Sequence, residues 1–150
     1  GGTSVADLFA ELRQRIDKRL VRSGMQLLWD VSPALPTLRQ LPPHAGVHLR
    51  AILNEAVANA LKHAQASEIG VHASMADGSL RITIRDNGTG HSTSTAVQDA
   101  RSGLGLRGMH ARALGMGWEL HAGPCSAPAA GFAVTLRAPI AGNLSETTHQ

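Results

Sequence analysis

Aromatic residues are scarce in this sequence of 150 residues, which has two Trp, two Phe and no Tyr. Stacking platforms for nucleic-acid bases are therefore few, and the core must be packed mainly with Leu, Val, Ile and Ala. Lys and Arg are scattered rather than gathered into a basic run, although the formal net charge is +3. We therefore expect no direct nucleic-acid partner, and we read the charge as a mild cationic character that suits a phosphate-bearing ligand.

Cysteine and long apolar runs are also lacking. Cys125 is the only cysteine, which excludes an internal disulfide and fits a reducing compartment. No apolar run approaches the roughly eighteen residues of a membrane span, and no signal peptide is recognisable. We expect no membrane contact from this chain, and we read residues 1–4, GGTS, as a cloning remnant or a disordered start.

Hydrophobic periodicity predicts one domain over residues 5–140, followed by a flexible tail over 141–150. Helical spacing of apolar residues predicts three helices, at residues 5–20, 44–64 and 104–115. Short apolar or alternating runs predict five strands, at residues 25–31, 69–75, 80–86, 118–122 and 132–138. Because hairpins outnumber crossovers, we expect an α+β fold, a two-layer sandwich with helices on one face of a mixed, mostly antiparallel sheet.

Two segments have no regular pattern. Four prolines make residues 32–43 a loop. The Ser/Thr/Gly-rich residues 88–103 have no hydrophobic period, and a loop of this length is typical of lids and binding loops.

The helix that contains NEAVANALKHA, residues 54–64, has an unusual polar face. At about 100° per residue, Glu55, Asn59, Lys62 and His63 fall on one side and the apolar residues on the other. A solvated surface would explain this pattern without any function, so the helix alone does not decide between the two interpretations.

The segment DNGTG, residues 86–90, ends a predicted strand with a carboxylate. Asn-Gly is typical of a hairpin turn, but no second alternating strand follows it. An Asp at a strand end beside a glycine-bearing loop can accept a hydrogen bond from an exocyclic amine, as an adenine-binding residue does. Asp86 is therefore a candidate binding residue, with Gly88 and Gly90 letting the backbone come close.

The segment GLGLRGM, residues 103–109, matches G-x-G-x-x-G. A dinucleotide fingerprint would need a strand before the first Gly and an acid about twenty residues later. Neither is present, since Glu119 comes too soon. A glycine-rich turn that opens a helix still offers backbone N–H groups to a phosphate, and Arg107 could add charge.

Together the three segments resemble the N, G1 and G2 boxes of the Bergerat-type ATP-binding fold shared by gyrase, heat-shock ATPases, mismatch-repair ATPases and sensor histidine kinases. The pattern E-x-x-x-N-x-x-K-H-A, the short lid and G-L-G-L-x-G-M are most similar to nitrate-sensor-like histidine kinases of bacterial two-component systems. The resemblance runs from the first predicted helix to the last predicted strand. It implies ATP and Mg²⁺ as cofactors and transfer of the γ-phosphoryl group to a histidine.

The resemblance also assigns roles to single residues. Asn59 would coordinate Mg²⁺ through its amide oxygen, Glu55 would orient or deprotonate the incoming imidazole, and Lys62 and His63 would lie beside the phosphates. Asp86 would bind the adenine amine. The remaining nucleotide-binding residues implied by the boxes are Gly88, Gly90, Gly103, Leu104, Gly105, Leu106, Arg107 and Gly108.

No phosphoacceptor motif of the Glu-Leu-His-Asp kind is present, so the His-containing dimerisation domain is absent from this chain. We therefore expect the fragment not to autophosphorylate alone. A response regulator is the implied partner in the full system, and the expected location is cytoplasmic, whether or not the whole sensor sits in a membrane.

Several alternatives stay open. The chain could be a serine kinase of the anti-sigma type, or an ATP-gated interaction module without transfer activity. Glu55 and Lys62 could be plain surface charges, and His63 could be a helix C-terminal cap. His44 and His48 are spaced like metal ligands, but no third ligand accompanies them, so we expect solvated histidines. The side chains of Leu106 and Met109 suit the core.

Overall fold

The computed structural model describes residues 4–62, 66–89 and 105–140. The elements follow one another along the chain as α1 (Val5–Ser23), β1 (Gln26–Val31), a short 3₁₀ helix η1 (Leu38–Gln40), α2 (Ala45–Leu61), β2 (Glu68–Ala76), β3 (Ser79–Asp86), α4 (Gly105–Met116), β4 (Glu119–Pro124) and β5 (Phe132–Pro139).

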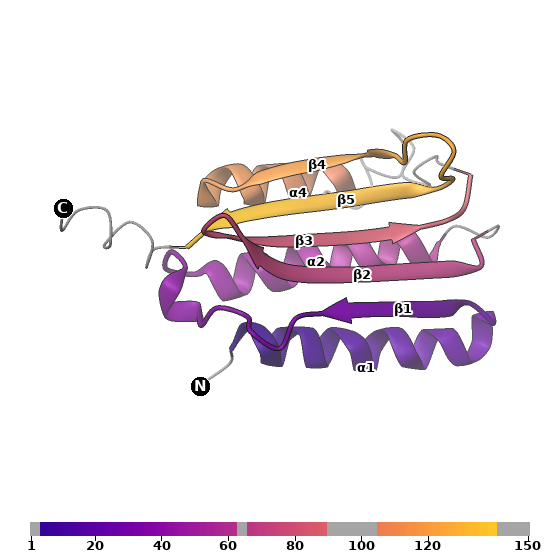
Figure 1. Ribbon diagram of the computed structural model, residues 1–150, viewed down its shortest axis with the longest axis horizontal. Helices are drawn as coiled ribbons and strands as arrows, with labels where there is room; N and C mark the ends of the chain where they lie inside the picture. The colour runs from indigo at the N-terminus through magenta and orange to yellow at the C-terminus, as the bar shows by residue number, and fades with distance from the viewer. Residues whose placement is uncertain (1–3, 63–65, 90–104, 141–150) are drawn as a thin grey trace.

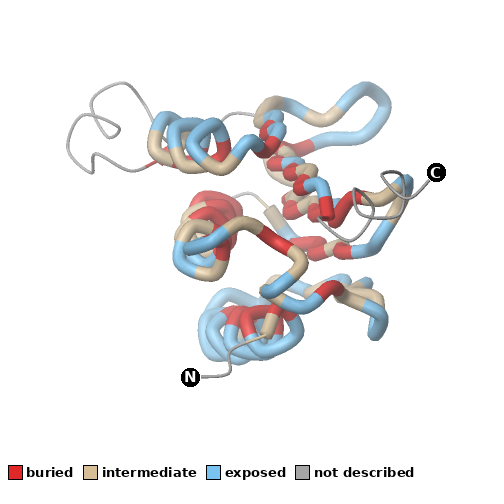
Figure 2. Tube along the Cα trace, turned by 90° about the vertical axis from the view of Figure 1, so that its left-hand side faces the viewer, coloured by how far each residue is buried: buried red, intermediate tan, exposed pale blue. Residues whose placement is uncertain are grey.

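The strands form one sheet in the order β1-β2-β3-β5-β4. β1 pairs with β2 in parallel, and the other three pairings are antiparallel. The helices α1, α2 and α4 all lie on one face of this sheet (Figures 1 and 2). The predicted α+β two-layer class is confirmed.

Alternation along the strands explains why only one face is covered. In β5 the buried positions alternate with more exposed ones, so that Val134 and Leu136 face the helices while Thr135 faces outward. The outer face is polar: Thr83 and Thr135 meet across strands at 3.4 Å, and Arg137 pairs with Glu119 at 3.3 Å. A sheet with one apolar and one polar face needs helices on one side only.

α1 begins and ends with clear signals. The Ser4 side chain accepts from the Asp7 N–H and Asp7 accepts from the Ser4 N–H, both at 3.0 Å, which is a capping box. Ser4 therefore belongs to the folded part of the chain. Gly24, with a φ of 73°, closes the helix in the left-handed region, where glycine has no steric cost. The apolar stripe that α1 buries consists of Val5, Leu8, Phe9, Leu12 and Ile16.

The predicted hairpin is confirmed. β2 and β3 are joined at Asp77 and Gly78, whose φ angles of 52° and 74° make the tight turn that matches the twist of the strands. The segment 32–43 is less irregular than expected, because its prolines flank a 3₁₀ turn rather than interrupt it. The Thr37 N–H donates to Gln40 Oε1 at 2.9 Å and stabilises this turn.

Boundaries elsewhere shift by a few residues. α2 starts at Ala45, after His44 with a φ of 66°, and its described part ends at Leu61. Most of the expected long loop 88–103 and the whole tail 141–150 lie outside the described residues. Within the described part of the chain, no helix combines the length and the apolar character that a bilayer crossing requires.

Candidate functional site

The three polar segments meet at one end of the molecule. α2 leads into β2 through a short connection, and the start of β2 pairs with the end of β3, with Ile69 opposite Asp86. The last turns of α2 and the end of β3 are therefore neighbours, at the right-hand side of Figure 1. α4 is joined to α2 there by a hydrogen bond from the Gly105 N–H to Glu55 Oε1 at 2.9 Å.

This hydrogen bond links two of the predicted boxes directly. Gly105 is the first residue of α4, and the first N–H groups of a helix have no partner within the helix. The half-buried Glu55 carboxylate supplies that partner from a different helix and places a negative charge at the positive end of the α4 dipole. Gly105 has a φ of 57°, a conformation in which other residues are strained. Glu55 therefore caps α4 and fixes its start against α2.

A cavity of about 300 Å³ lies beside this bond, between α2 and α4. Each helix contributes residues at spacings of three and four, which face one another across a groove. Its lining consists of Arg15, Ala51, Asn54, Glu55, Ala58, Gly105, Gly108, Met109 and Arg112. Residues of the N and G2 boxes thus share a cavity, whereas the described lining includes neither Asn59 nor Asp86.

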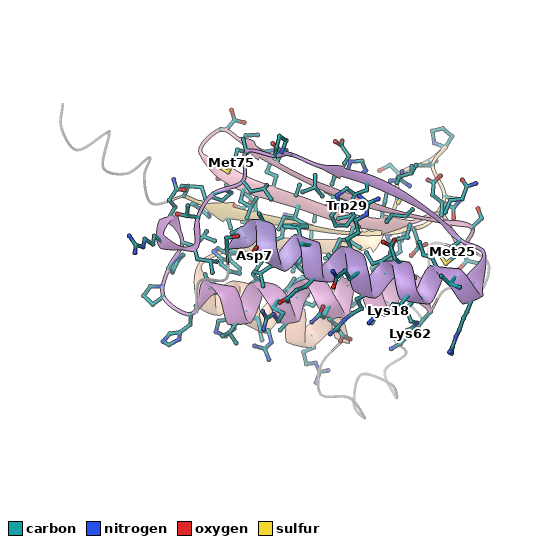
Figure 3. All side chains as sticks on the ribbon, turned by 90° about the horizontal axis from the view of Figure 1, so that it is seen from below. Asp7, Lys18, Met25, Trp29, Lys62 and Met75 are labelled. Atoms are coloured by element: carbon teal, nitrogen blue, oxygen red, sulfur yellow. The ribbon has the colours of Figure 1, made fainter. Side chains whose placement is uncertain are left out.

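Asn59 and Asp86 are buried instead, with 4% and 1% of their surface exposed. Of the described polar residues, only Ser79 is as deeply buried. A solvated face therefore does not explain Asn59, although it does explain Lys62, which is exposed at the end of α2 (Figure 3). Burying a polar side chain is costly unless it is hydrogen-bonded, so the burial of Asn59 and Asp86 requires hydrogen-bond partners inside the protein. Asp86 Oδ1 accepts from the Gly88 N–H at 2.8 Å, which orients the carboxylate.

Asn87 has a role that the sequence reading missed. Its Oδ1 accepts from the N–H groups of Ser67 and Glu68 at 2.8 and 3.0 Å, and its Nδ2 donates to Ser67 Oγ at 2.9 Å. Asn-Gly is therefore not a hairpin turn here. Asn87 ties the end of β3 to the start of β2 and holds Asp86 in place through the backbone. The available signal was an Asn directly after a strand, which is equally typical of a turn.

Gly131 was also missed. It has a φ of 111°, and a Cβ at this position would overlap the carbonyl oxygen of Asp86. The chain entering β5 thus packs against the backbone of Asp86 with no room for a side chain. An Ala/Gly-rich connection gave no indication of this close approach.

Gly131→Ala is expected to lower the free energy of unfolding by about 2–5 kcal/mol, because it combines a strained φ with overlap against the Asp86 backbone. Urea denaturation of the variant would measure this loss. Gly123→Ala is the matched control, since Gly123 in β4 has open space around its Cβ position. Equal stability of the two variants would contradict the packing described for Gly131.

The residues in the first turns of α4 differ in how far they are buried. Arg107 is exposed and Leu106 is half-buried against the core, while Met109 is 2% exposed, as expected for a core residue. The residues His63, Gly90, Gly103 and Leu104 lie outside the described residues.

The two spaced histidines belong to no group of metal ligands within the part of the chain that the structure describes. His48 Nδ1 lies 3.2 Å from Arg112 Nη1, and His44 is exposed at the start of α2. Among the described residues, no group of three or more His, Cys, Asp or Glu could hold a metal ion.

Residues 44–142 match the family described as "Histidine kinase-, DNA gyrase B-, and HSP90-like ATPase". The chain belongs to this family. The match contains all three boxes and every strand except β1, so the predicted resemblance to the ATPase superfamily is confirmed. Among the described elements, α1, β1 and η1 precede the matched residues.

Curated relatives of the domain are sensor proteins. The nitrate/nitrite sensor protein NarQ of Escherichia coli (strain K12) is 45% identical over 86 residues, which are 57% of this chain and 15% of NarQ. The sensor protein VraS of Staphylococcus saprophyticus is 25% identical over 139 residues, which are 93% of this chain and 35% of VraS. The domain thus spans about a third or less of these relatives.

A solved structure supports the same assignment. Full-length ShkA, crystallised in complex with AMPPNP, has a TM-score of 0.72 and 26% identity over 93% of this chain and 31% of that chain. The prediction of a histidine kinase ATP-binding domain similar to nitrate sensors is confirmed by the family and the relatives together.

Proposed function

We propose that this domain binds Mg-ATP where α2, β3 and α4 converge, and that it transfers the γ-phosphoryl group to a histidine on a separate helical domain. The observation that carries the proposal is the hydrogen bond from Gly105 to Glu55, which joins two boxes beside a cavity of about 300 Å³. Membership of an ATPase family and similarity to the AMPPNP-bound ShkA support ATP as the nucleotide.

Adenine recognition is assigned to Asp86. Its burial and its bond from the Gly88 N–H support a fixed carboxylate that accepts a hydrogen bond from the exocyclic amine. Gly88 and Gly90 allow the base to approach the backbone. The G2 box of residues 103–108 is assigned to the phosphates, through N–H groups in the first turn of α4 other than the Gly105 N–H, which Glu55 already binds.

The residues present suit Mg²⁺. Asn59 and Glu55 lie one turn apart on α2 and carry hard oxygen donors, which this ion prefers. We propose Asn59 as the protein ligand. When bound, the ion neutralises charge on the phosphates.

Glu55 is proposed to orient the incoming imidazole and to take its proton, while Lys62 and His63 add positive charge near the phosphates. This chemistry asks mainly for positioning, and Glu55 is already held by α4. We also propose that residues 5–140, with Ser4 as the cap of α1, form the domain, that the full protein serves a response regulator, and that the domain works in the cytoplasm.

The reaction can be tested by adding a designed two-helix hairpin that carries one histidine to this chain with labelled ATP. Acid-labile phosphohistidine on the hairpin supports histidine kinase activity. Phosphoserine on a protein partner would support the serine kinase instead. Nucleotide binding without any transfer would leave the gated interaction module.

Asn59→Ala is expected to abolish the Mg²⁺ dependence of ATP binding, because the proposed protein ligand is gone. Calorimetric titration with and without Mg²⁺ would measure it. Asn54→Ala is the matched control, since Asn54 lies on the same helix and lines the cavity outside the proposed metal site. Thermal unfolding checks that the variant folds, because a buried amide contributes about 1–3 kcal/mol. A preserved Mg²⁺ effect would remove Asn59 from the site.

A further inference from the structure

Another cavity, of about 410 Å³, lies at the opposite end of the molecule from the three boxes, where β5 ends at the left of Figure 1. α4 connects the two ends: its first residue, Gly105, bonds to Glu55, and its last residue, Met116, lines this cavity. At 1.5 Å per residue, the ends of α4 are about 17 Å apart. The cavity is therefore separate from the one between α2 and α4, and their described linings share no residue.

The lining of this cavity contains no charged side chain within the described residues. Three segments meet there: the chain before α2, the end of α4 with the two residues after it, and the end of β5. The lining residues are Gln40, Leu41, Pro42, Pro43, Met116, Gly117, Trp118, Pro139 and Ile140. Mostly apolar walls around a volume in the usual range of ligand pockets, roughly 300–1,000 Å³, suit an uncharged apolar molecule.

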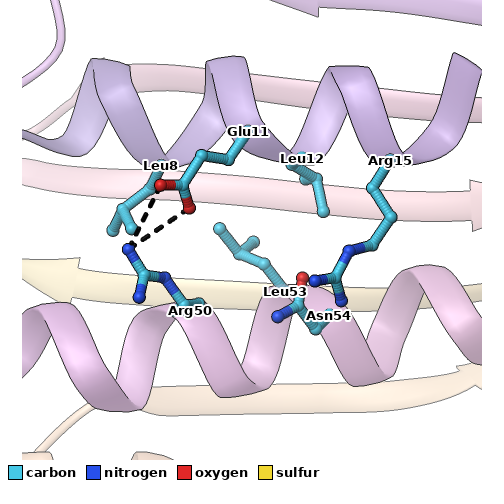
Figure 4. Close-up of a pocket in the computed structure, with 7 residues that line it drawn as sticks. All are labelled: Leu8, Glu11, Leu12, Arg15, Arg50, Leu53 and Asn54. Carbon is cyan, nitrogen blue, oxygen red and sulfur yellow. Dashed lines mark hydrogen bonds and ion pairs between the residues drawn. The ribbon is translucent and has the colours of Figure 1, made fainter.

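The other hollows of the helical layer differ in charge. The one between α1 and α2 encloses about 130 Å³, and Arg50 pairs there with Glu11, with Nη2 3.2 Å from Oε2 (Figure 4). The cavity between α2 and α4 has Glu55 and Arg112 in its lining. An uncharged apolar molecule would strip water from these charges without offering them a partner. Of these three hollows, the cavity at the end of α4 is therefore the one that suits such a ligand.

Trp118 brings an unpaired polar atom to this cavity. Its side chain is 5% exposed, and its indole nitrogen is the one buried side-chain N or O atom of the described residues without a hydrogen-bond partner. A buried Trp N–H usually has a partner, because an unpaired buried donor is costly. The backbone at this position is already satisfied, since the Trp118 main-chain N–H donates to the Ala113 carbonyl at 2.8 Å. The indole is thus the group that a ligand with an acceptor would complete.

We propose that this cavity binds a small, uncharged, largely apolar molecule that carries a carbonyl or similar oxygen acceptor, and that the Trp118 indole N–H donates a hydrogen bond to that oxygen. The apolar walls supply affinity by removing the ligand from water. The indole supplies selectivity, because an analogue without the oxygen leaves the N–H unpaired. This site is additional to the proposed nucleotide chemistry and does not depend on it.

The test compares two probes of nearly equal size, benzophenone and diphenylmethane, which differ by a carbonyl group in place of a methylene. Binding of each to the 150-residue chain is followed by NMR titration. Diphenylmethane leaves water more readily, so hydrophobic transfer alone would favour it. Benzophenone should nevertheless bind about five- to tenfold more tightly, which is the contribution expected of one buried hydrogen bond.

The indole signals report the hydrogen bond directly. The chain has two Trp residues, so two indole N–H signals are expected, and Trp29→Phe identifies which is which. Benzophenone should move the Trp118 indole proton downfield, as hydrogen bonding does, and diphenylmethane should not. Trp29 lies on β1 with its ring against Phe9 and is not part of the described lining, so its signal should stay in place.

Two variants and a competitor locate the effect. Trp118→Phe keeps an aromatic ring without the N–H and should lose the preference for benzophenone, whereas the matched control Trp29→Phe should keep it. Saturating AMPPNP should change the affinity for benzophenone by less than about twofold, because the two cavities are far apart. Competition by AMPPNP would place the probe in the nucleotide cavity and overturn the inference.

The two probes on the parent chain decide the inference even if Trp118→Phe does not fold. It is overturned if neither probe binds, if diphenylmethane binds as tightly as benzophenone, or if the Trp118 indole signal does not move with benzophenone. Survival of the preference in a folded Trp118→Phe would also overturn it. A Trp118 signal that moves with protein concentration instead would assign the cavity to a second copy of the chain.

Discussion

Glu55→Gln is expected to lower phosphoryl transfer to histidine about 10²- to 10⁴-fold, the usual contribution of a general base. The affinity for ATP should change little, because the Gln amide oxygen can still accept from the Gly105 N–H that Glu55 binds at 2.9 Å. Gln cannot take the proton of the imidazole. Single-turnover transfer to the designed hairpin, measured beside calorimetric ATP binding, separates the two effects.

Glu55→Ala should lose the anchor of α4 as well as the base. Loss of a helix N-cap costs about 1 kcal/mol, which corresponds to roughly fivefold faster hydrogen exchange in the first turn of α4. Exchange over residues 105–109 should therefore match the parent in the Gln variant and exceed it in the Ala variant. Full transfer activity in Glu55→Gln would exclude Glu55 as the base, and unchanged exchange in Glu55→Ala would exclude it as the cap.

Asp86→Asn is expected to weaken ATP binding about 10- to 100-fold, since a hydrogen bond to a charged group contributes about 1.5–3 kcal/mol. Its Oδ1 can still accept from Gly88, as the Asp oxygen does at 2.8 Å. The other oxygen becomes an NH₂ group, which cannot accept from the adenine amine. The preference for ATP over GTP should collapse, as measured by calorimetry with both nucleotides.

Asp77→Asn is the matched control for this prediction. Asp77 lies in the turn that joins β2 to β3, at the end of the hairpin away from Asp86, and its side chain is exposed. The control should keep the parent's nucleotide preference. Similar ATP and GTP affinities in the parent, or an undiminished preference in Asp86→Asn, would remove Asp86 from the adenine site.

Features that depend on neighbouring residues in the chain were predictable. The β2–β3 hairpin followed from alternation around Asp77-Gly78, and α1 followed from its apolar spacing and its closing Gly24. The one-sided helical layer followed from the order of the elements. In each case the signal is local, because a helix or a hairpin is specified by the spacing of its own side chains and by its turn residues.

The site was harder to predict because its residues act across elements. The burial of Asn59 could not be derived from its helix, where it occurs among charged and apolar residues alike. The sequence assigned no role to Asn87, because its three hydrogen bonds go to Ser67 and Glu68, about twenty residues away where β2 begins. Glycine is required at position 131 because the Asp86 backbone leaves no room for a Cβ and because φ is 111°, and neither condition can be read from the neighbouring residues.

The elements, the order in which they occur and the three boxes could all be read along the chain, since periodicity, turn chemistry and motif spacing are properties of neighbouring residues. Packing alone decided that Glu55 caps α4, that Arg15 of α1 lines the cavity between α2 and α4, and that Asp86 pairs with β2 while Gly131 packs against its backbone just before β5. These contacts join residues tens of positions apart, and their partners are specified by how helices and strands pack rather than by any local pattern.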